Sequence, residues 1–252
     1  MPLKTRLIPV LLFAHYNVVT TVQFAKQRNV GSPVASVRQY SRQQVDELIF
    51  LDIKACRENR GPVFELLKDI VEESLMPLTV GGGIRSIKDI EHLLKLGADK
   101  VAFNTAAHYT PSLIKESSRA YGSQCIVASV DIRRQENRVY SVCSTGGQFC
   151  SREDPVSYCL RMEELGAGEI LLTSVDRNGS MSGYDIPLCR MISDSVRVPV
   201  IINGGAGDYQ HFVDGILEGH ASAVAASSIF QYTQHNPIAG RAFMKEKNLN
   251  VR

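Results

Sequence analysis

Three aspartates stand where short apolar segments of the chain end, and this position suggests acid–base chemistry. Asp52, Asp131 and Asp176 each close or follow such a segment. A carboxylate at the open end of a fold can act as a general acid or base toward a bound substrate. The alternative is structural, because such a carboxylate can also cap the next turn or pair with an arginine, as Asp131 could with Arg133 or Arg134.

Two glycine-rich turns follow two further apolar segments and suggest phosphate binding. They occupy 81–83 and 204–207, and the next apolar segment after each ends in a polar pair, at 104–105 and 227–228. Glycine lets backbone N–H groups approach an anion closely. Two such clusters predict a substrate with a phosphate at each end, whereas a ligand-free tight turn is the alternative for a glycine run alone. The predicted phosphate-binding residues are Gly82, Gly83, Asn104, Thr105, Gly179, Gly204, Gly205, Ala226 and Ser227.

An internal repeat indicates which elements position these residues. Shifting the sequence by 122 residues superimposes three pairs of segments, which are 77–83 on 199–205, 48–53 on 170–175, and 101–105 on 223–227. Three matches in one register indicate two fused copies of one half. We expect half-barrels over about 1–122 and 123–245.

Eight apolar runs without two-residue alternation are typical of strands buried on both faces of a parallel sheet. These runs are 6–13, 48–53, 77–81, 100–104, 125–131, 169–175, 199–203 and 222–226. Amphipathic helices are predicted between several of them, for example over 86–97 and 155–165. The pattern predicts a single (β/α)8 barrel domain, a TIM barrel, over 1–252, with an open doubly wound sheet as the rival.

In such a barrel the active site lies at the carboxyl ends of the strands. That rule places the aspartates and glycine turns around one mouth, with Leu12 at the end of the first strand. It also adds Thr173 and Asn203 to Asp52 and Asp176 as predicted substrate-binding residues.

Composition narrows the function classes further. The 252 residues include 28 Lys and Arg against 26 Asp and Glu, a net charge of +2 that argues against a general nucleic-acid binder. No apolar run approaches the roughly 20 residues of a membrane helix, so we expect no membrane partner. The histidines show no metal-ligand spacing, and neither a metal nor a cofactor is expected. The six scattered cysteines predict reduced thiols in a cytoplasmic protein.

Several motifs resemble the cyclase subunit of imidazole glycerol phosphate synthase. The similar segments run from about residue 4 to the carboxyl terminus and are 6–9, 46–53, 80–84, 165–177, 182–185, 204–207 and 225–228. The resemblance implies a (β/α)8 barrel that receives ammonia from a glutaminase subunit docked at its bottom. That family adds the ammonia to a bisphosphorylated ribulosyl substrate, closes an imidazole ring and releases an aminoimidazole carboxamide ribotide.

The catalytic end departs from the family pattern. The family uses two aspartates, of which Asp131 matches the second, but Leu12 stands at the first position. Thr20 replaces a lysine, Asn178 an aspartate and Asn203 a serine. Losing one member of an acid–base pair costs about 10²–10⁴-fold in rate. The cyclase activity of this chain is therefore in doubt.

The opposite end keeps the family pattern. The resemblance implies that Arg6, Glu47, Lys100 and Glu169 close the ammonia entrance, and that Asp99 faces the glutaminase. A structural ion-pair layer is the alternative for these four residues. Leu11-Leu12 and the segment 29–33 are similar to a subgroup that accompanies surface-polysaccharide genes. That subgroup is thought to supply ammonia for acetamidino sugars.

Three functions follow. The first is an ammonia-channelling barrel that works with a glutaminase in amidination, on a nucleotide-linked sugar and with a possible separate sugar amidotransferase. The second is a genuine cyclase of histidine biosynthesis that uses the bisphosphorylated substrate. The third is a non-catalytic phosphate-binding scaffold.

Overall fold

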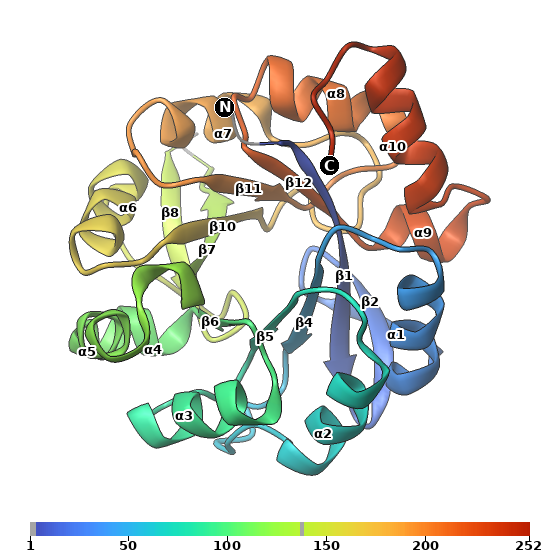
Figure 1. Cartoon of the computed structure of the whole chain (residues 1–252). Helices are drawn as coiled ribbons and strands as arrows, with labels where there is room; N and C mark the ends of the chain where they lie inside the picture. The colour runs from blue at the N-terminus through green and yellow to red at the C-terminus, as the bar shows by residue number, and fades with distance from the viewer. Residues whose placement is uncertain (1–3, 137–138) are drawn as a thin grey trace.

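Eight parallel strands close into a barrel in the computed structural model, which describes residues 4–136 and 139–252 (Figure 1). Around the barrel the strands are β1 (Arg6–Ala14), β4 (Leu48–Asp52), β5 (Leu78–Gly81), β6 (Lys100–Phe103), β7 (Ile126–Arg134), β10 (Glu169–Ser174), β11 (Val200–Asn203) and β12 (Ala223–Ala226). Pairing of β1 with β12 and of β7 with β10 completes the closure. The predicted (β/α)8 barrel is confirmed, and each strand lies where the sequence predicted it.

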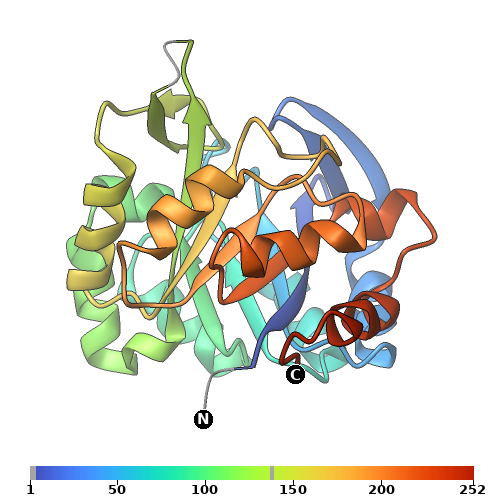
Figure 2. The ribbon, with the colours of Figure 1, turned by 90° about the horizontal axis from the view of Figure 1, so that it is seen from above.

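Helices cover the outside of the barrel (Figures 1 and 2). They are α1 (Pro33–Arg42), α2 (Phe64–Glu73), α3 (Ile87–Leu96), α4 (Thr105–Tyr109), α5 (Ser112–Tyr121), α6 (Pro155–Glu164), α7 (Ile186–Ser193), α8 (Tyr209–Leu217), α9 (Ser228–Tyr232) and α10 (Pro237–Glu246), with a 3₁₀ turn at Ser123–Cys125. Ser86 and Asp89 form a capping box that starts α3, and Gly97 ends it at a φ of 115°. Ile90 and Leu93 are buried between these ends, and the helix predicted over 86–97 is confirmed.

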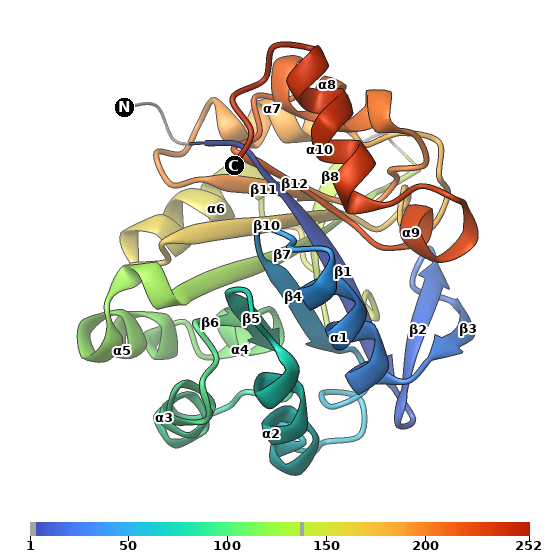
Figure 3. The same ribbon diagram turned by 45° about the vertical axis from the view of Figure 1, so that its right-hand side comes forward.

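Two antiparallel hairpins extend the barrel at the end where the carboxyl ends of its strands lie. The first consists of β2 (Asn17–Val22) and β3 (Lys26–Gly31), and the second of β8 (Tyr140–Ser144) and β9 (Phe149–Cys150). β2 pairs with the end of β1, and β8 with the end of β7. Both hairpins lie at the end of the barrel opposite the carboxyl terminus (Figure 2), and Figure 3 shows β2 and β3 beside β1.

The expectation of six reduced thiols is wrong for two of them. Cys143 and Cys150 form a disulfide across the paired strands β8 and β9. The turn between these strands places the two cysteines opposite each other, and no sequence pattern indicated that hairpin. The other four cysteines are free thiols. The cytoplasmic location stays a prediction, and it no longer has the support of six reduced cysteines.

Side chains inside the barrel change character along its axis. The middle is an apolar layer of Ile8, Val10, Ile49, Ala102, Val127, Leu171, Ile201, Ala223 and Ala225. Because alternate residues of a strand face the same side, the residues two positions earlier on four strands meet at the bottom, and those two positions later approach the mouth.

In the described part of the chain, none of the helices is both long and apolar enough to span a bilayer.

Candidate functional site

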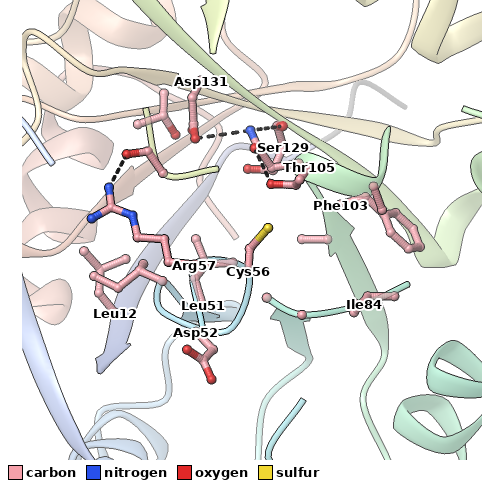
Figure 4. Close-up of a pocket in the computed structure, with 18 of the residues that line it drawn as sticks. Leu12, Leu51, Asp52, Cys56, Arg57, Ile84, Phe103, Thr105, Ser129 and Asp131 are labelled. Atoms are coloured by element: carbon pink, nitrogen blue, oxygen red, sulfur yellow. Dashed lines mark hydrogen bonds between the residues drawn. The ribbon is translucent and has the colours of Figure 1, made fainter. Parts of the chain in front are cut away.

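A cavity of about 380 Å³ opens at the carboxyl ends of the strands (Figure 4). We call it the mouth cavity. It brings together many of the residues predicted from sequence, which are Leu12, Asp52, Gly82, Gly83, Asn104, Thr105, Asp131, Thr173 and Asn203. These residues come from seven of the eight barrel strands or the turns that follow them. The closed sheet therefore converts distant sequence positions into one lined pocket.

Asp131 lies buried at the wall of the mouth cavity. Burial raises the pKa of its carboxyl to about 7, and a hydrogen bond from Thr173 acts in the opposite direction. Asn203 Nδ2 donates to Thr173 Oγ1 at 3.1 Å, which orients that hydroxyl toward the carboxylate. No ion pair with Arg133 or Arg134 is found in the described part of the chain. An acid with this pKa can both accept and give a proton near neutral pH.

Asn104 holds the other side of Asp131. Its Nδ2 lies 3.2 Å from Asp131 Oδ2, 3.1 Å from the Ser129 carbonyl oxygen and 3.3 Å from that of Cys143. The amide therefore fixes the carboxylate against the second hairpin. Thr105 Oγ1 accepts a hydrogen bond from the Thr145 N–H at 3.1 Å, which places the hairpin turn beside the predicted phosphate residues.

Asp52 has the structural role that was the alternative to catalysis: it caps a turn and pairs with an arginine. Its Oδ1 accepts from the N–H groups of Lys54 and Ala55, both at 3.0 Å. Its two oxygens also form a bidentate pair with Arg60, at 2.6 and 3.0 Å. Although Asp52 lines the mouth cavity, its carboxylate points away from Asp131 (Figure 4). Both carboxylate oxygens are engaged within the loop, so Asp52 shapes that loop.

Asp176 lies outside the mouth cavity. Its Oδ2 accepts from the N–H of Arg134 at 2.7 Å, at the end of β7. It lines a shallow groove on the outer rim together with Tyr140 and Asp185. The structure therefore does not bring Asp176 together with Asp131, and the predicted contact with a substrate in the mouth has no geometric support.

Leu12 lies in an apolar setting. It is 8% exposed and belongs to the interior cluster of the barrel. It pairs across β1 and β2 with Val19, which is also in that cluster. The position at which the cyclase resemblance implied a first aspartate is thus part of the apolar lining. A leucine here has no proton to exchange.

The predicted phosphate-binding residues fall into two groups. Gly82, Gly83, Asn104 and Thr105 line the mouth cavity. The remaining five lie outside its lining, and these are Gly179, Gly204, Gly205, Ala226 and Ser227. The structure therefore gathers only the cluster of the first half around the open space.

Four charged residues meet at the bottom of the barrel and form what we call the charge ring. Arg6 Nη1 lies 2.9 Å from Glu47 Oε1 and 2.8 Å from Glu169 Oε1. Lys100 Nζ lies 3.1 Å from Glu47 Oε2 and 2.8 Å from Glu169 Oε2. Each cation thus bridges both carboxylates, and the four residues that the family resemblance implied at this end form a closed ring.

The charge ring is largely withdrawn from water, with side-chain exposures between 7% and 16%. Burial alone would raise the pKa of Glu47, but Arg6 and Lys100 together hold this pKa below its usual value. Burial likewise opposes the charge of Arg6, while Glu169 and Glu47 raise its pKa. The four charges compensate one another, which makes their burial tolerable.

Residues 6–235 match the model of a family described as histidine biosynthesis protein. The chain belongs to this family. Its members are enzymes of isomerase or cyclase type on a TIM barrel. The histidine biosynthesis family accounts for the fold, and the identity of the reaction depends on the residues at the two ends of the barrel.

Some residues at this family member's mouth were not found from sequence. Arg57, Arg85 and Cys56 line the cavity from loops, and Ser129 does so from β7. Arg85 follows Gly83 by two residues, so a search for cations beside the glycine turn could have found it. Among the described residues no group of three or more His, Cys, Asp or Glu side chains is placed to hold a metal ion.

Proposed function

We propose that the protein is an ammonia-channelling barrel that works with a glutaminase subunit docked at its bottom. One observation carries this proposal: a closed ring of two cations and two carboxylates stands at the foot of the barrel, directly below an apolar interior. A channel for a small neutral molecule needs both features, a controlled entrance and a wall that does not retain its cargo.

The apolar layer supplies selectivity. Transfer of an ion into an apolar interior is strongly unfavourable, whereas neutral ammonia lacks that penalty. The layer contains small side chains at Ala102, Ala223 and Ala225, all almost fully buried. Entry requires one cation of the charge ring to move away from the axis. The docked glutaminase supplies the contacts that favour this movement.

At the mouth, Asp131 acts as a general base toward the incoming nitrogen. With a pKa of about 7 its carboxylate can accept a proton from ammonia as the new C–N bond forms at an amide carbon, and the separate amidotransferase activates the amide oxygen, which leaves that carbon. The opposite wall offers Leu12 and so no second acid. A reaction with one carboxylate suits amidination better than ring closure. We assign the product to acetamidino-sugar biosynthesis for surface polysaccharide, with a separate sugar amidotransferase as partner.

The second candidate is the cyclase of histidine biosynthesis. Its support is the buried Asp131 beside the glycine turn of the first half. In that case the barrel would make imidazole glycerol phosphate and aminoimidazole carboxamide ribotide from the bisphosphorylated substrate. Leu12 argues against this candidate, because it removes the other half of the acid–base pair.

Two assays separate the candidates. The first mixes the purified barrel with the glutaminase subunit and measures complex formation and glutamine hydrolysis. We expect binding and a faster hydrolysis than with the glutaminase alone; the absence of both would remove the channelling proposal. The second supplies the barrel with ammonium salt and the ribulosyl substrate. We expect no imidazole glycerol phosphate, and its formation would favour the cyclase.

A further inference from the structure

The mouth cavity is asymmetric although the sequence repeats. Thr105 and Ser227 occupy equivalent positions in the two halves, as do the glycine turns. Thr105 lines the cavity, whereas Ser227 does not. Ser227 Oγ is covered from solvent and has no hydrogen-bond partner among the described residues. An anion could reach the first hydroxyl without rearrangement but not the second.

The β2–β3 hairpin covers the second half. Thr21 Oγ1 donates to Asn178 Oδ1 at 2.7 Å, and the Gln23 N–H donates to the Asn178 carbonyl oxygen at 2.9 Å. The hydroxyls of Thr20 and Tyr232 share a further hydrogen bond, between β2 and the end of α9. The hairpin is therefore fastened both to the loop after β10 and to the helix after β12.

The fastening places hairpin backbone against Gly179, one residue of the predicted second phosphate site. A Cβ built on Gly179 would lie 2.0 Å from the Thr21 carbonyl oxygen, so the two backbones are in direct contact. A carbonyl oxygen repels a phosphate, because its partial negative charge faces the anion and it has no proton to donate. Thr20 and Thr21 are only 3% and 4% exposed, which shows that this part of the hairpin is packed into the molecule.

The first half offers the opposite environment. Arg57 and Arg85 line the cavity beside Gly82 and Gly83. Neither arginine forms an ion pair with a carboxylate in the described part of the chain. Arg57 instead donates to the Gly146 carbonyl oxygen at 2.5 Å. Two cations without a carboxylate partner beside a glycine turn favour an anionic ligand.

We infer that the mouth accepts a substrate whose phosphate forms one single group, held over the first half-barrel by the Gly82–Gly83 turn, Thr105, Arg57 and Arg85. The ligand class is a phosphate or diphosphate ester whose remaining groups are uncharged. A sugar joined to a nucleoside diphosphate fits this description, whereas a substrate with a phosphate at each end does not. Thr21 and Asn178 determine this specificity. The inference rests on the proposed function only for the reaction that follows binding.

Backbone amide signals test this inference directly. Isotope-labelled protein is titrated with inorganic pyrophosphate while amide shifts are followed by nuclear magnetic resonance. We expect saturable shifts at Gly82, Gly83 and Thr105 and none at Gly204 or Gly205. Equal saturable shifts in both groups would overturn the inference, as would the absence of shifts in the first group.

Three variants sharpen the test. Arg57→Gln combined with Arg85→Gln should weaken pyrophosphate binding by at least about tenfold, because each charge-assisted hydrogen bond contributes about 1.5–3 kcal/mol. Arg177→Gln is the matched control, since Arg177 is an exposed rim arginine outside the cavity. It should bind like the unaltered protein, and an equal loss in both would show that only general charge attraction is measured.

The third variant unfastens the hairpin. Thr21→Val combined with Asn178→Ala should make Gly204 and Gly205 respond to pyrophosphate as well. A lack of response in a folded variant would contradict the assigned role of these two residues. None of these titrations involves the glutaminase. Their failure therefore leaves ammonia delivery standing, and failure of the glutaminase assay leaves the binding result standing.

Discussion

At the scale of single residues, Asp131 is a carboxylic acid that the fold removes from water. Burial raises its pKa to about 7. The folded state therefore binds the proton more tightly than the unfolded state does. The contribution of Asp131 to stability is greatest below its unfolded pKa and is lost as pH rises toward 7.

Asp131→Asn removes this pH dependence. The variant should be more stable than the unaltered protein at pH 8 by about 1–3 kcal/mol, and the difference should shrink at pH 5. Urea unfolding at the two pH values measures it. Asp176→Asn is the control, because Asp176 lies on the outer rim. A difference that does not change with pH would show that Asp131 keeps an ordinary pKa.

Leu12→Asp places a charge in the interior apolar cluster. Because Leu12 packs in the cluster that holds Val19, the carboxylate should lower the free energy of unfolding by roughly 1–3 kcal/mol at pH 8. Leu12→Asn separates the effect of charge from that of polarity. Equal losses for the two variants at pH 8 would contradict a desolvated site.

The sequence pattern predicted correctly that Asp52 and Asp131 lie at the carboxyl ends of barrel strands, but it did not predict which role each aspartate has. Asp52 and Asp131 both close an apolar run, yet Arg60 and two backbone N–H groups engage Asp52, while Asp131 is desolvated. These differences arise from loops that pack against each carboxylate. Local sequence does not encode such contacts, because the partners are set by where a loop folds back.

At the scale of elements, the second hairpin links the disulfide to the mouth. Cys143 is opposite Asp131 in the β7–β8 register, and its carbonyl oxygen accepts from Asn104. The disulfide closes a short loop whose turn contacts Thr105 and Arg57. Its loss should loosen that turn more than it affects the barrel.

Cys150→Ser should lower stability by about 2 kcal/mol under oxidising conditions, since the cross-link restricts a loop of seven to eight residues in the unfolded chain. Thermal unfolding with and without a thiol reductant measures the effect. In reductant the variant and the unaltered protein should melt together. Cys125→Ser, at a free thiol, is the control. Reductant-independent melting of the unaltered protein would argue against the disulfide.

The barrel strands were predictable because each is a continuous apolar run buried on both faces. The hairpins were not. β2 and β8 contain buried threonines and serines, such as Thr20, Thr21 and Ser141, and they pair with strand ends that project beyond the barrel. The burial of these hairpin residues depends on the strand ends with which they pair and on loops that are distant in the sequence. The asymmetry of the mouth follows from these hairpins and was therefore hidden in the repeated sequence.

At the scale of the whole molecule, the charge ring and the mouth lie at opposite ends of the apolar layer inside the barrel. Glu47→Gln leaves Arg6 and Lys100 to share a single carboxylate. Breaking a buried pair in this way typically costs about 3–5 kcal/mol. The loss should be largest near neutral pH and shrink as pH falls, because the lowered pKa of Glu47 stabilises the fold only while its carboxyl is ionised.

Urea unfolding of Glu47→Gln at pH 7 and in steps below pH 4.5, the ordinary pKa of this carboxyl, checks the prediction. The exposed pair of Glu91 and Lys95 on α3 provides the comparison, and Glu91→Gln should change stability very little. An equally small change for both variants would show that the ring contributes nothing to the folded barrel.

The most direct test of the account traces nitrogen through the passage. The barrel, the glutaminase and the sugar amidotransferase receive amide-¹⁵N glutamine, a nucleotide-linked N-acetyl sugar and an excess of unlabelled ammonium, and the amidino product is analysed by mass spectrometry. We predict ¹⁵N in the product, and a marked loss of label with Ala225→Leu, which adds bulk to the apolar layer inside the barrel, but not with Ala128→Leu in the other core cluster. A product that carries nitrogen only from the unlabelled ammonium would contradict channelling through this barrel.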